Sequence, residues 1–244
     1  MLSRRTLLMT FAAAPFARAA GAPVPVTLTA GDGVKVFGWH YQGRDKSESP
    51  ILLFHQAGSN HAEYSTIAPR LAQMNYHCLV LDQRAGGDMW GVKNKTAAAL
   101  GKEAEYLEAL PDLEAALVWS KTQGFAKRPI VWGSSYSAAL VFLLAARHAR
   151  EIAAVLAFSP GEYLGQPHLV EEAAKKLQMP VFIDSAKDDQ EIAIAHTLAA
   201  ASKATQFVPK LAGLHGSSTL RQDRNPKGAA ENWEAVISFL SQLP

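Results

Sequence analysis

The sequence has little of several features that would mark particular classes of protein. Its 244 residues contain a single cysteine, Cys78, so no internal disulfide framework can form. Cys78 lies in an apolar run, and we interpret it as a small buried hydrophobic residue. There is no acidic cluster and no pair of histidines four residues apart, so neither a metal centre nor any other cofactor is expected. The apolar stretch of residues 7–14 is too short to span a bilayer as a stable helix.

An excess of charge of one sign is also missing once the N-terminus is set aside. Arg4 and Arg5 precede the apolar stretch, and Ala17-Arg18-Ala19 has the small-x-small form of a cleavage site, which is typical of a secretory signal of the twin-arginine type. Cleavage after residue 19 would leave 21 basic against 22 acidic residues. We therefore expect residues 1–19 to be an export signal, the mature protein to be periplasmic or secreted, and no nucleic acid to be bound. Stable insertion in a membrane after signal removal is not expected.

Residues 20–244 have the composition of one globular domain, with 48% hydrophobic and 19% charged residues over the whole chain. Short apolar runs without alternation, which predict strands buried on both faces, are separated by helical patterns. This order predicts an α/β fold with a mostly parallel sheet covered by helices on both sides. Expected strands cover residues 51–54, 78–81, 130–132, 153–158, 180–184 and 206–211 after a hairpin at 24–41, and the clearest helices cover 111–123, 136–148, 191–202 and 229–242.

Residues 133–137, Gly-Ser-Ser-Tyr-Ser, stand between an expected strand and an expected helix. They nearly fit the nucleophile elbow G-x-S-x-G, in which a sharp turn presents the central serine above a helix N-terminus. Small residues two places on either side let the strand and helix approach closely. Ser135 is the centre of this motif, and Ser137 stands where the motif has glycine, which predicts a tighter turn.

Reactive side chains also follow two later strands. Asp184, Asp188 and Asp189 come at or after the strand at 180–184, and His215 lies in a loop after the last strand. The order of Ser135, an aspartate and then His215 is the chain order of the α/β-hydrolase triad. In these motifs the sequence resembles the α/β-hydrolase superfamily over nearly all of residues 20–244, and it looks most similar to small, lid-less dienelactone-hydrolase-like esterases.

The resemblance implies roles for individual residues. The family's acid stands in a G-x-x-D pattern, and residues 186–189 match it with alanine for glycine, which favours Asp189 over the runner-up Asp188; Asp184 lies too close to the strand. The family's His-Gly-x-Gly loop corresponds to residues 55–58, with Gln56 replacing its glycine. One oxyanion N–H is therefore expected from Ala57, or from Gln56 after a shift of one residue. The other is expected from Tyr136, the residue after the nucleophile.

These assignments predict a hydrolase that cleaves a small carboxylic ester through an acyl-enzyme, with Ser135, His215 and Asp189 as the triad. A peptidase or amidase with the same triad and a non-catalytic binding protein with this fold are the alternatives. Residues 159–179 must hold a crossover helix and leave only about a dozen residues, too few for a helical cap. We therefore expect no large lid, an open pocket and a preference for short acyl groups.

Overall fold

The computed structural model describes residues 21–244, so the expected signal at residues 1–19 lies outside the described residues. The strands of the described part are β1 (Val24–Thr29), β2 (Lys35–Tyr41), β3 (Ile51–Phe54), β4 (Cys78–Leu81), β5 (Ile130–Ser134), β6 (Ala154–Phe158), β7 (Val181–Asp184) and β8 (Thr205–Phe207). Its α-helices are α1 (Ile67–Gln73), α2 (Lys95–Leu100), α3 (Leu110–Thr122), α4 (Tyr136–Arg147), α5 (Leu169–Ala174), α6 (Asp189–Ser202) and α7 (Ala229–Ser241). Short 3-10 helices are η1 (His61–Tyr64), η2 (Met89–Gly91), η3 (Tyr106–Ala109) and η4 (Gly216–Leu220).

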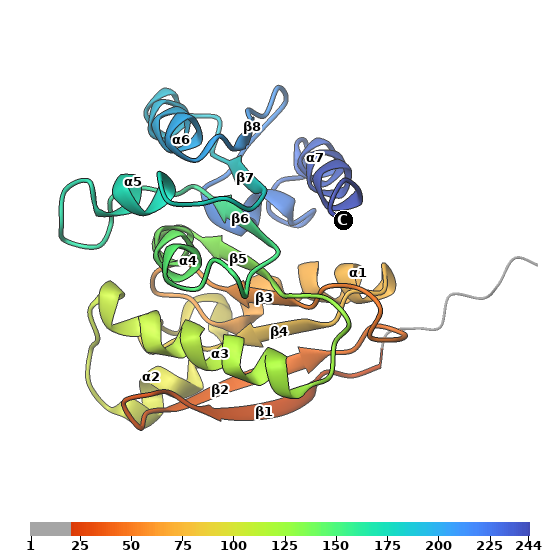
Figure 1. The fold of residues 1–244 in the computed structure, drawn as a ribbon, viewed down its shortest axis with the longest axis vertical. Coiled ribbons are helices and arrows are strands. Elements are labelled where there is room, and N and C mark those ends of the chain that lie inside the picture. The colour runs from red at the N-terminus through yellow and green to blue at the C-terminus, as the bar shows by residue number, and fades with distance from the viewer. Residues whose placement is uncertain (1–20) are drawn as a thin grey trace, which may run out of the picture.

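These strands form one eight-stranded sheet in the order β1-β2-β4-β3-β5-β6-β7-β8, which runs from bottom to top in Figure 1. β1 and β2 make the expected antiparallel hairpin, and β2 also pairs antiparallel with β4. From β4 to β8 all neighbours are parallel, so the carboxyl ends of β3 to β8 meet at one edge of the sheet. This arrangement is the α/β-hydrolase fold, and in such sheets ligands bind beyond that edge.

Helices cover both faces of the sheet, as the unbroken apolar runs predict. In β3, Leu52 belongs to the hydrophobic cluster that includes α3, α4, α5 and α6, whereas Leu53 belongs to the cluster that includes α1 and α7. Figure 1 shows these two helical layers to the left and right of the strands. Neighbouring residues of a strand point to opposite faces, so each central strand is buried twice and cannot alternate with polar residues.

Two expected elements differ from those observed in ways that affect the candidate site. The last strand ends at Phe207 rather than at residue 211, so a longer loop leads to His215. Helix α6 begins at Asp189 rather than at residue 191, because Asp188 caps it: the Asp188 carboxylate accepts hydrogen bonds from the N–H groups of Gln190 and Glu191.

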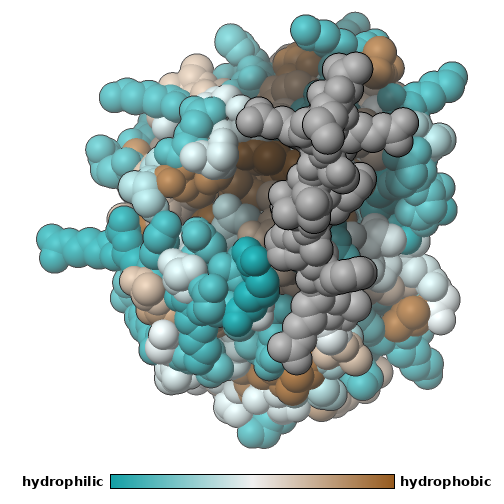
Figure 2. Space-filling view, turned by 90° about the vertical axis from the view of Figure 1, so that its right-hand side faces the viewer, coloured by the Kyte–Doolittle hydropathy of each residue, from teal (hydrophilic) through white to brown (hydrophobic). Residues whose placement is uncertain are grey.

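Within residues 21–244, no large lid covers the carboxyl edge of the sheet. Between β6 and β7, where a cap would be inserted, the chain forms only the six-residue helix α5 and loops. The face in Figure 2 is largely hydrophilic, with hydrophobic residues in scattered places and in one hollow. Among residues 21–244, no helix combines the length and the apolar character needed to cross a membrane.

Candidate active site

Ser135 occupies the tip of the turn between β5 and α4 in a backbone conformation that is rare for serine, with φ 57° and ψ −120°. The turn is so tight that a Cβ on Gly133 would lie 2.2 Å from the carbonyl oxygen of Ser137. Glycine is therefore required at residue 133. Non-glycine residues with positive φ tend to mark functional sites, where the surrounding structure compensates for the strain.

Ser137, which replaces the second glycine of the elbow motif, is fully buried. Its hydroxyl donates to the carbonyl oxygen of His55 at 2.6 Å and accepts from the Gln83 side-chain amide at 2.6 Å. The serine hydroxyl thus connects the elbow to the ends of β3 and β4. The departure from the motif leaves the turn intact and adds two hydrogen bonds beneath it.

The structure brings Ser135 and His215 together from residues far apart in the chain. His215 Nε2 lies 2.8 Å from Ser135 Oγ. The loop that carries His215 is fixed immediately afterwards, because Gly216 adopts a positive φ and donates its N–H to Ser159 Oγ at 2.9 Å. Ser135 is 8% exposed, whereas the His215 side chain is 41% exposed, so the pair lies at the surface and a solvent molecule or substrate can reach it.

The carboxylate that contacts His215 is Glu191, which sequence reasoning missed. His215 Nδ1 lies 2.7 Å from Glu191 Oε1, and the other carboxylate oxygen accepts the N–H of Ala186 at 3.0 Å. Neither Asp189, the expected acid, nor Asp188, the runner-up, contacts His215. Asp188 is occupied as the cap of α6, and Asp189 is exposed at the first position of the helix. The structure therefore places Glu191 against His215, and not Asp189 or Asp188 as the G-x-x-D pattern predicts.

A signal for Glu191 is present in the sequence. Asp188 and Glu191 have the spacing of a capping box, in which the N-cap residue is followed three positions later by glutamate. Placing the start of the helix at Asp188 would have put Glu191 in the first turn, facing the carboxyl edge of the sheet. Because the expected helix began at residue 191, the spacing of Asp188 and Glu191 was not recognised as a helix start.

The charges of His215 and Glu191 support each other. The hydrogen bond that His215 donates to Glu191 raises the pKa of His215 and outweighs the effect of burial, which acts in the opposite direction. Burial alone would raise the pKa of Glu191, but hydrogen bonds from His215, Ser159 and the Ala186 N–H together lower it. Glu191 is thus ionised at neutral pH and accepts a hydrogen bond from His215 Nδ1, which carries the ring proton. That tautomer leaves Nε2 free to accept the Ser135 proton.

The loop after β3 has one N–H that is engaged and one that is free. The Gln56 N–H donates to Glu63 Oε2 at 2.8 Å, while the Gln56 carbonyl oxygen lies 2.8 Å from His55 Nδ1. Because C=O and N–H of a trans peptide point in opposite directions, the Ala57 N–H is directed away from His55. Within the described residues, neither the Ala57 N–H nor the Tyr136 N–H donates to an acceptor. Of the two expected loop donors, Gln56 is thus already bonded and Ala57 is available.

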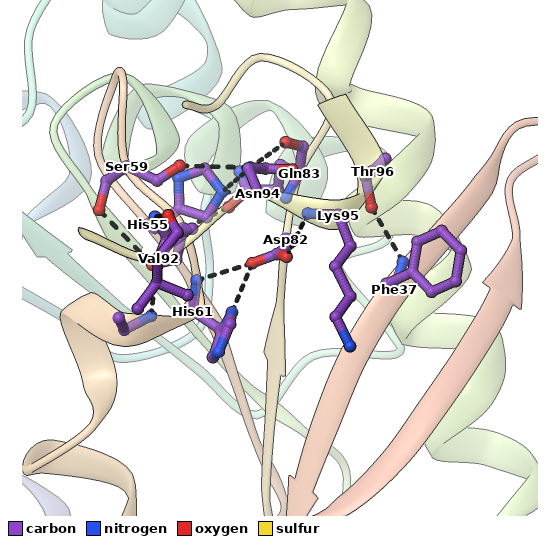
Figure 3. Close-up of polar contacts among 12 residues, drawn as sticks. Phe37, His55, Ser59, His61, Asp82, Gln83, Val92, Asn94, Lys95 and Thr96 are labelled. Atoms are coloured by element: carbon purple, nitrogen blue, oxygen red, sulfur yellow. Dashed lines mark hydrogen bonds and ion pairs between the residues drawn. The ribbon is translucent and has the colours of Figure 1, made fainter. Parts of the chain in front are cut away.

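A buried polar network holds this loop (Figure 3). His55 Nε2 accepts the N–H of Gln83 at 2.9 Å and lies 3.3 Å from the side-chain nitrogen of Asn94. Asp82 accepts from the backbone N–H and ring Nδ1 of His61 and from the N–H of Lys95. His55 and His61 are therefore both engaged in hydrogen bonds with protein groups. Residues 21–244 contain no group of three or more His, Cys, Asp or Glu side chains placed to hold a metal ion.

A cavity of about 620 Å³ lies beside this loop. It is lined by Gly58 next to Ala57, by Gly86 and Gly87 after β4, and by Tyr106, whose ring stacks on that of Tyr136 at 4.6 Å between centroids. Arg84 also contributes to the lining, but its guanidinium is paired with Asp32 and Asp112. Besides glycine backbone and the Tyr106 ring, the lining includes the charged residues Asp88, Lys102 and Glu103.

The order of the strands and the helices on both faces of the sheet place the protein in the α/β-hydrolase class. Residues 38–243 match the model of the dienelactone hydrolase family, and the chain belongs to that family. No curated protein matches the sequence.

Solved structures share the fold at low sequence identity. An esterase of Pyrococcus furiosus is 20% identical with a TM-score of 0.70, and the alignment covers 91% of this chain and 92% of that one. A dienelactone hydrolase of Anabaena variabilis is 15% identical with a TM-score of 0.67, with 91% and 99% covered. An acylaminoacyl peptidase of Pyrococcus horikoshii is 15% identical with a TM-score of 0.65, and this chain covers 41% of it. At these identities the structures establish the fold alone.

Proposed function

We propose that the protein is a serine esterase that cleaves small carboxylic esters with Ser135, His215 and Glu191 as its catalytic triad. The observation that carries this proposal is the line of hydrogen bonds from Ser135 Oγ through both ring nitrogens of His215 to Glu191, at 2.8 and 2.7 Å. A nucleophile, a base and an orienting carboxylate in this order are what acyl transfer requires.

In the proposed reaction Ser135 Oγ attacks the ester carbonyl while its proton passes to His215 Nε2. Glu191 stabilises the resulting imidazolium, and His215 then returns the proton to the leaving alkoxide as the C–O bond breaks. Water attacks the acyl-enzyme with His215 again acting as base, and the carboxylic acid leaves. The free N–H groups of Ala57 and Tyr136 are the proposed hydrogen-bond donors to the oxyanion. Because Tyr136 is the first residue of α4, the positive end of the helix dipole also stabilises the oxyanion.

A short acyl group is the substrate that the surroundings of Ser135 support best. The segment between β6 and β7 forms no cap, and His215 is partly exposed, so an open site has little surface to bind a long chain at roughly 0.8 kcal/mol per buried methylene. kcat/KM for p-nitrophenyl acetate and butyrate should exceed that for palmitate. A preference for palmitate, or a rise in rate above its solubility limit, would contradict this. Hydrolysis of aminoacyl anilides but not esters would favour an amidase.

The test of the proposed chemistry is Ser135→Ala. Hydrolysis should fall by roughly 10³-fold or more, because only binding and oxyanion stabilisation remain. Labelling by a fluorophosphonate should disappear in the variant, and mass spectrometry of the labelled wild-type protein should locate the adduct on Ser135. An adduct on Ser134 or Ser137, or unchanged labelling of the variant, would contradict the assignment.

We also propose that the enzyme is exported, which rests on the sequence of residues 1–19 alone. Mature protein from the periplasm should begin at Ala20 or Gly21. Replacing Arg4 and Arg5 by lysine should leave the precursor in the cytoplasm. Normal export of that variant would show that the twin-arginine interpretation is wrong.

A further inference from the structure

Glu63 is a fully buried carboxylate that the proposed triad does not use. It lies in η1, which follows the oxyanion loop in the chain. A buried carboxylate requires hydrogen-bond donors or a cation, because its desolvation is costly. The contacts of Glu63 therefore indicate its role in the structure.

Each oxygen of the carboxylate accepts a hydrogen bond from a different segment. Oε2 accepts the N–H of Gln56 at 2.8 Å, and Oε1 accepts the hydroxyl of Ser134 at 2.7 Å. The Ser134 oxygen in turn accepts the N–H of Ser217 at 2.8 Å. Since Ser134 has one hydroxyl proton and already accepts from Ser217, its proton points to Glu63.

The three segments are those that carry the reacting groups. Gln56 precedes Ala57, Ser134 precedes Ser135, and Ser217 stands two residues after His215. The Glu63 carboxylate thus binds the oxyanion loop and the elbow directly, and it is connected to the His215 loop through Ser134. The space is tight, because a Cβ on Gly216 would lie 2.4 Å from Ser134 Oγ and 3.6 Å from Glu63 Oε1.

The charge of Glu63 also acts on the site. Burial raises the pKa of Glu63 to about 7, against the hydrogen bonds from Gln56 and Ser134 and the positive charges of Arg221 and His215. Tyr64 and Tyr136 lie near it as uncharged groups: burial raises the pKa of both, and the negative charge of Glu63 adds to that effect. After the hydrogen bond that His215 donates to Glu191, the Glu63 charge is among the contributions that raise the pKa of His215.

We propose that Glu63 is a positioning residue of the active site, which holds the oxyanion loop, the elbow and the His215 loop together and, when ionised, supplies a second negative charge that stabilises the His215 imidazolium. This inference rests on the proposed function, because it assigns Glu63 a role in proton transfer through His215. It differs from a purely structural role in one respect: removal of the charge must change the acid–base behaviour of His215.

The first test is Glu63→Gln, which keeps the shape but removes the charge and one acceptor. kcat should fall by about 10- to 100-fold because the oxyanion donor and His215 lose their fixed positions, with a smaller change in KM. The acid limb of kcat/KM should move to lower pH. Asp112→Asn is the matched control: Asp112 is an equally buried carboxylate bound to Arg84, and its replacement should cost stability without moving the acid limb.

Ser134→Ala provides a second variant that removes the link between Glu63 and Ser217 without burying a new amide. It should lower kcat in the same direction, and the double variant should lose less than the product of the two single effects, because both act through one contact. Independent losses that multiply would contradict the proposed connection.

Titration of the His215 ring by NMR tests the same inference without substrate. The pKa of His215 should be lower in Glu63→Gln than in the wild-type protein and unchanged in Asp112→Asn. If Glu63→Gln lowers stability but leaves both the His215 pKa and the acid limb in place, Glu63 is only structural and the inference is wrong. Failure of the proposed function would appear differently, as full activity in Ser135→Ala.

Discussion

His55 and His215 lie at the same edge of the sheet, and each holds a proton on Nδ1 that is donated to an oxygen. The acceptor for His55 is the neutral carbonyl of Gln56, whereas the acceptor for His215 is the carboxylate of Glu191. The other ring nitrogen of His55 faces the N–H of Gln83, while that of His215 faces the Ser135 hydroxyl. The two rings therefore differ in their partners rather than in tautomer.

The consequence is an opposite change in basicity. Burial lowers the pKa of His55 to about 4, since no carboxylate is bonded to its ring to compensate for complete desolvation. The hydrogen bond to Glu191 raises the pKa of His215, which remains partly exposed. A histidine becomes a base at this edge when a carboxylate and an accessible donor flank it, and otherwise it serves as a fixed part of the scaffold.

The largest expected difference between the two histidines is in turnover. His215→Ala should lower kcat by on the order of 10⁴-fold or more, because the base that takes the Ser135 proton is removed. The measurement is single-turnover hydrolysis of p-nitrophenyl acetate, with circular dichroism to show that the fold is retained. A loss of less than tenfold in a folded protein would refute the assignment of His215 as the base.

The second prediction concerns the carboxylate that distinguishes His215 from His55. Glu191→Gln should lower kcat by roughly 10³- to 10⁴-fold, because the amide does not stabilise the imidazolium and can favour the other tautomer. In the pH–rate profile of the residual activity, the acid limb should lie at lower pH than in the wild-type protein, since the pKa of His215 is no longer raised.

Asp189→Asn and Asp188→Asn are the matched controls for Glu191→Gln. Asp189 is exposed and should tolerate the change, and Asp188→Asn keeps an N-cap side chain that can accept the same hydrogen bonds. A large loss of turnover in Asp189→Asn with little loss in Glu191→Gln would restore the expectation drawn from the G-x-x-D pattern.

The fold was predictable from the sequence because buried parallel strands are unbroken apolar runs, and the elbow because its turn demands small residues such as Gly133. The G-x-x-D pattern predicted Asp189, whereas the contact of Glu191 with His215 becomes apparent only once α6 is known to begin at Asp189. Glu63 belongs to no catalytic motif and resembles any glutamate of a helical turn. Its contacts with Gln56 and Ser134 exist only once β3 and β5 are side by side.

The third prediction concerns His55 as the group that directs the Ala57 N–H. His55→Asn should keep a donor near the position of Nδ1, whereas His55→Leu should remove it and free the peptide between Gln56 and Ala57 to rotate. We expect His55→Leu to lose about 10- to 100-fold in kcat and His55→Asn to lose less. Both should lower stability by about 1–3 kcal/mol, because Gln83 and Asn94 lose a buried acceptor. Equal activities of the two variants would show that His55 does not direct this peptide.

The last prediction concerns the pH dependence of stability, to which the two histidines contribute with opposite signs. The folded state binds a proton on His55 only below about pH 4, whereas the unfolded chain binds it below about pH 6.5. The contribution of neutral His55 is therefore fully present above pH 6.5 and is lost as the pH falls towards 4, by on the order of 3 kcal/mol. His40, whose pKa burial also lowers to about 4, acts in the same pH range.

The raised pKa of His215 has the opposite effect on stability, since its contribution is present below pH 6.5 and is lost as the pH rises through the folded value. Urea unfolding between pH 4.5 and 7.5 should thus show a shallower slope for His55→Leu than for the wild-type protein. His215→Ala should show a slope that is equal or steeper, and an unchanged slope in His55→Leu would mean that His55 is not held neutral by the fold.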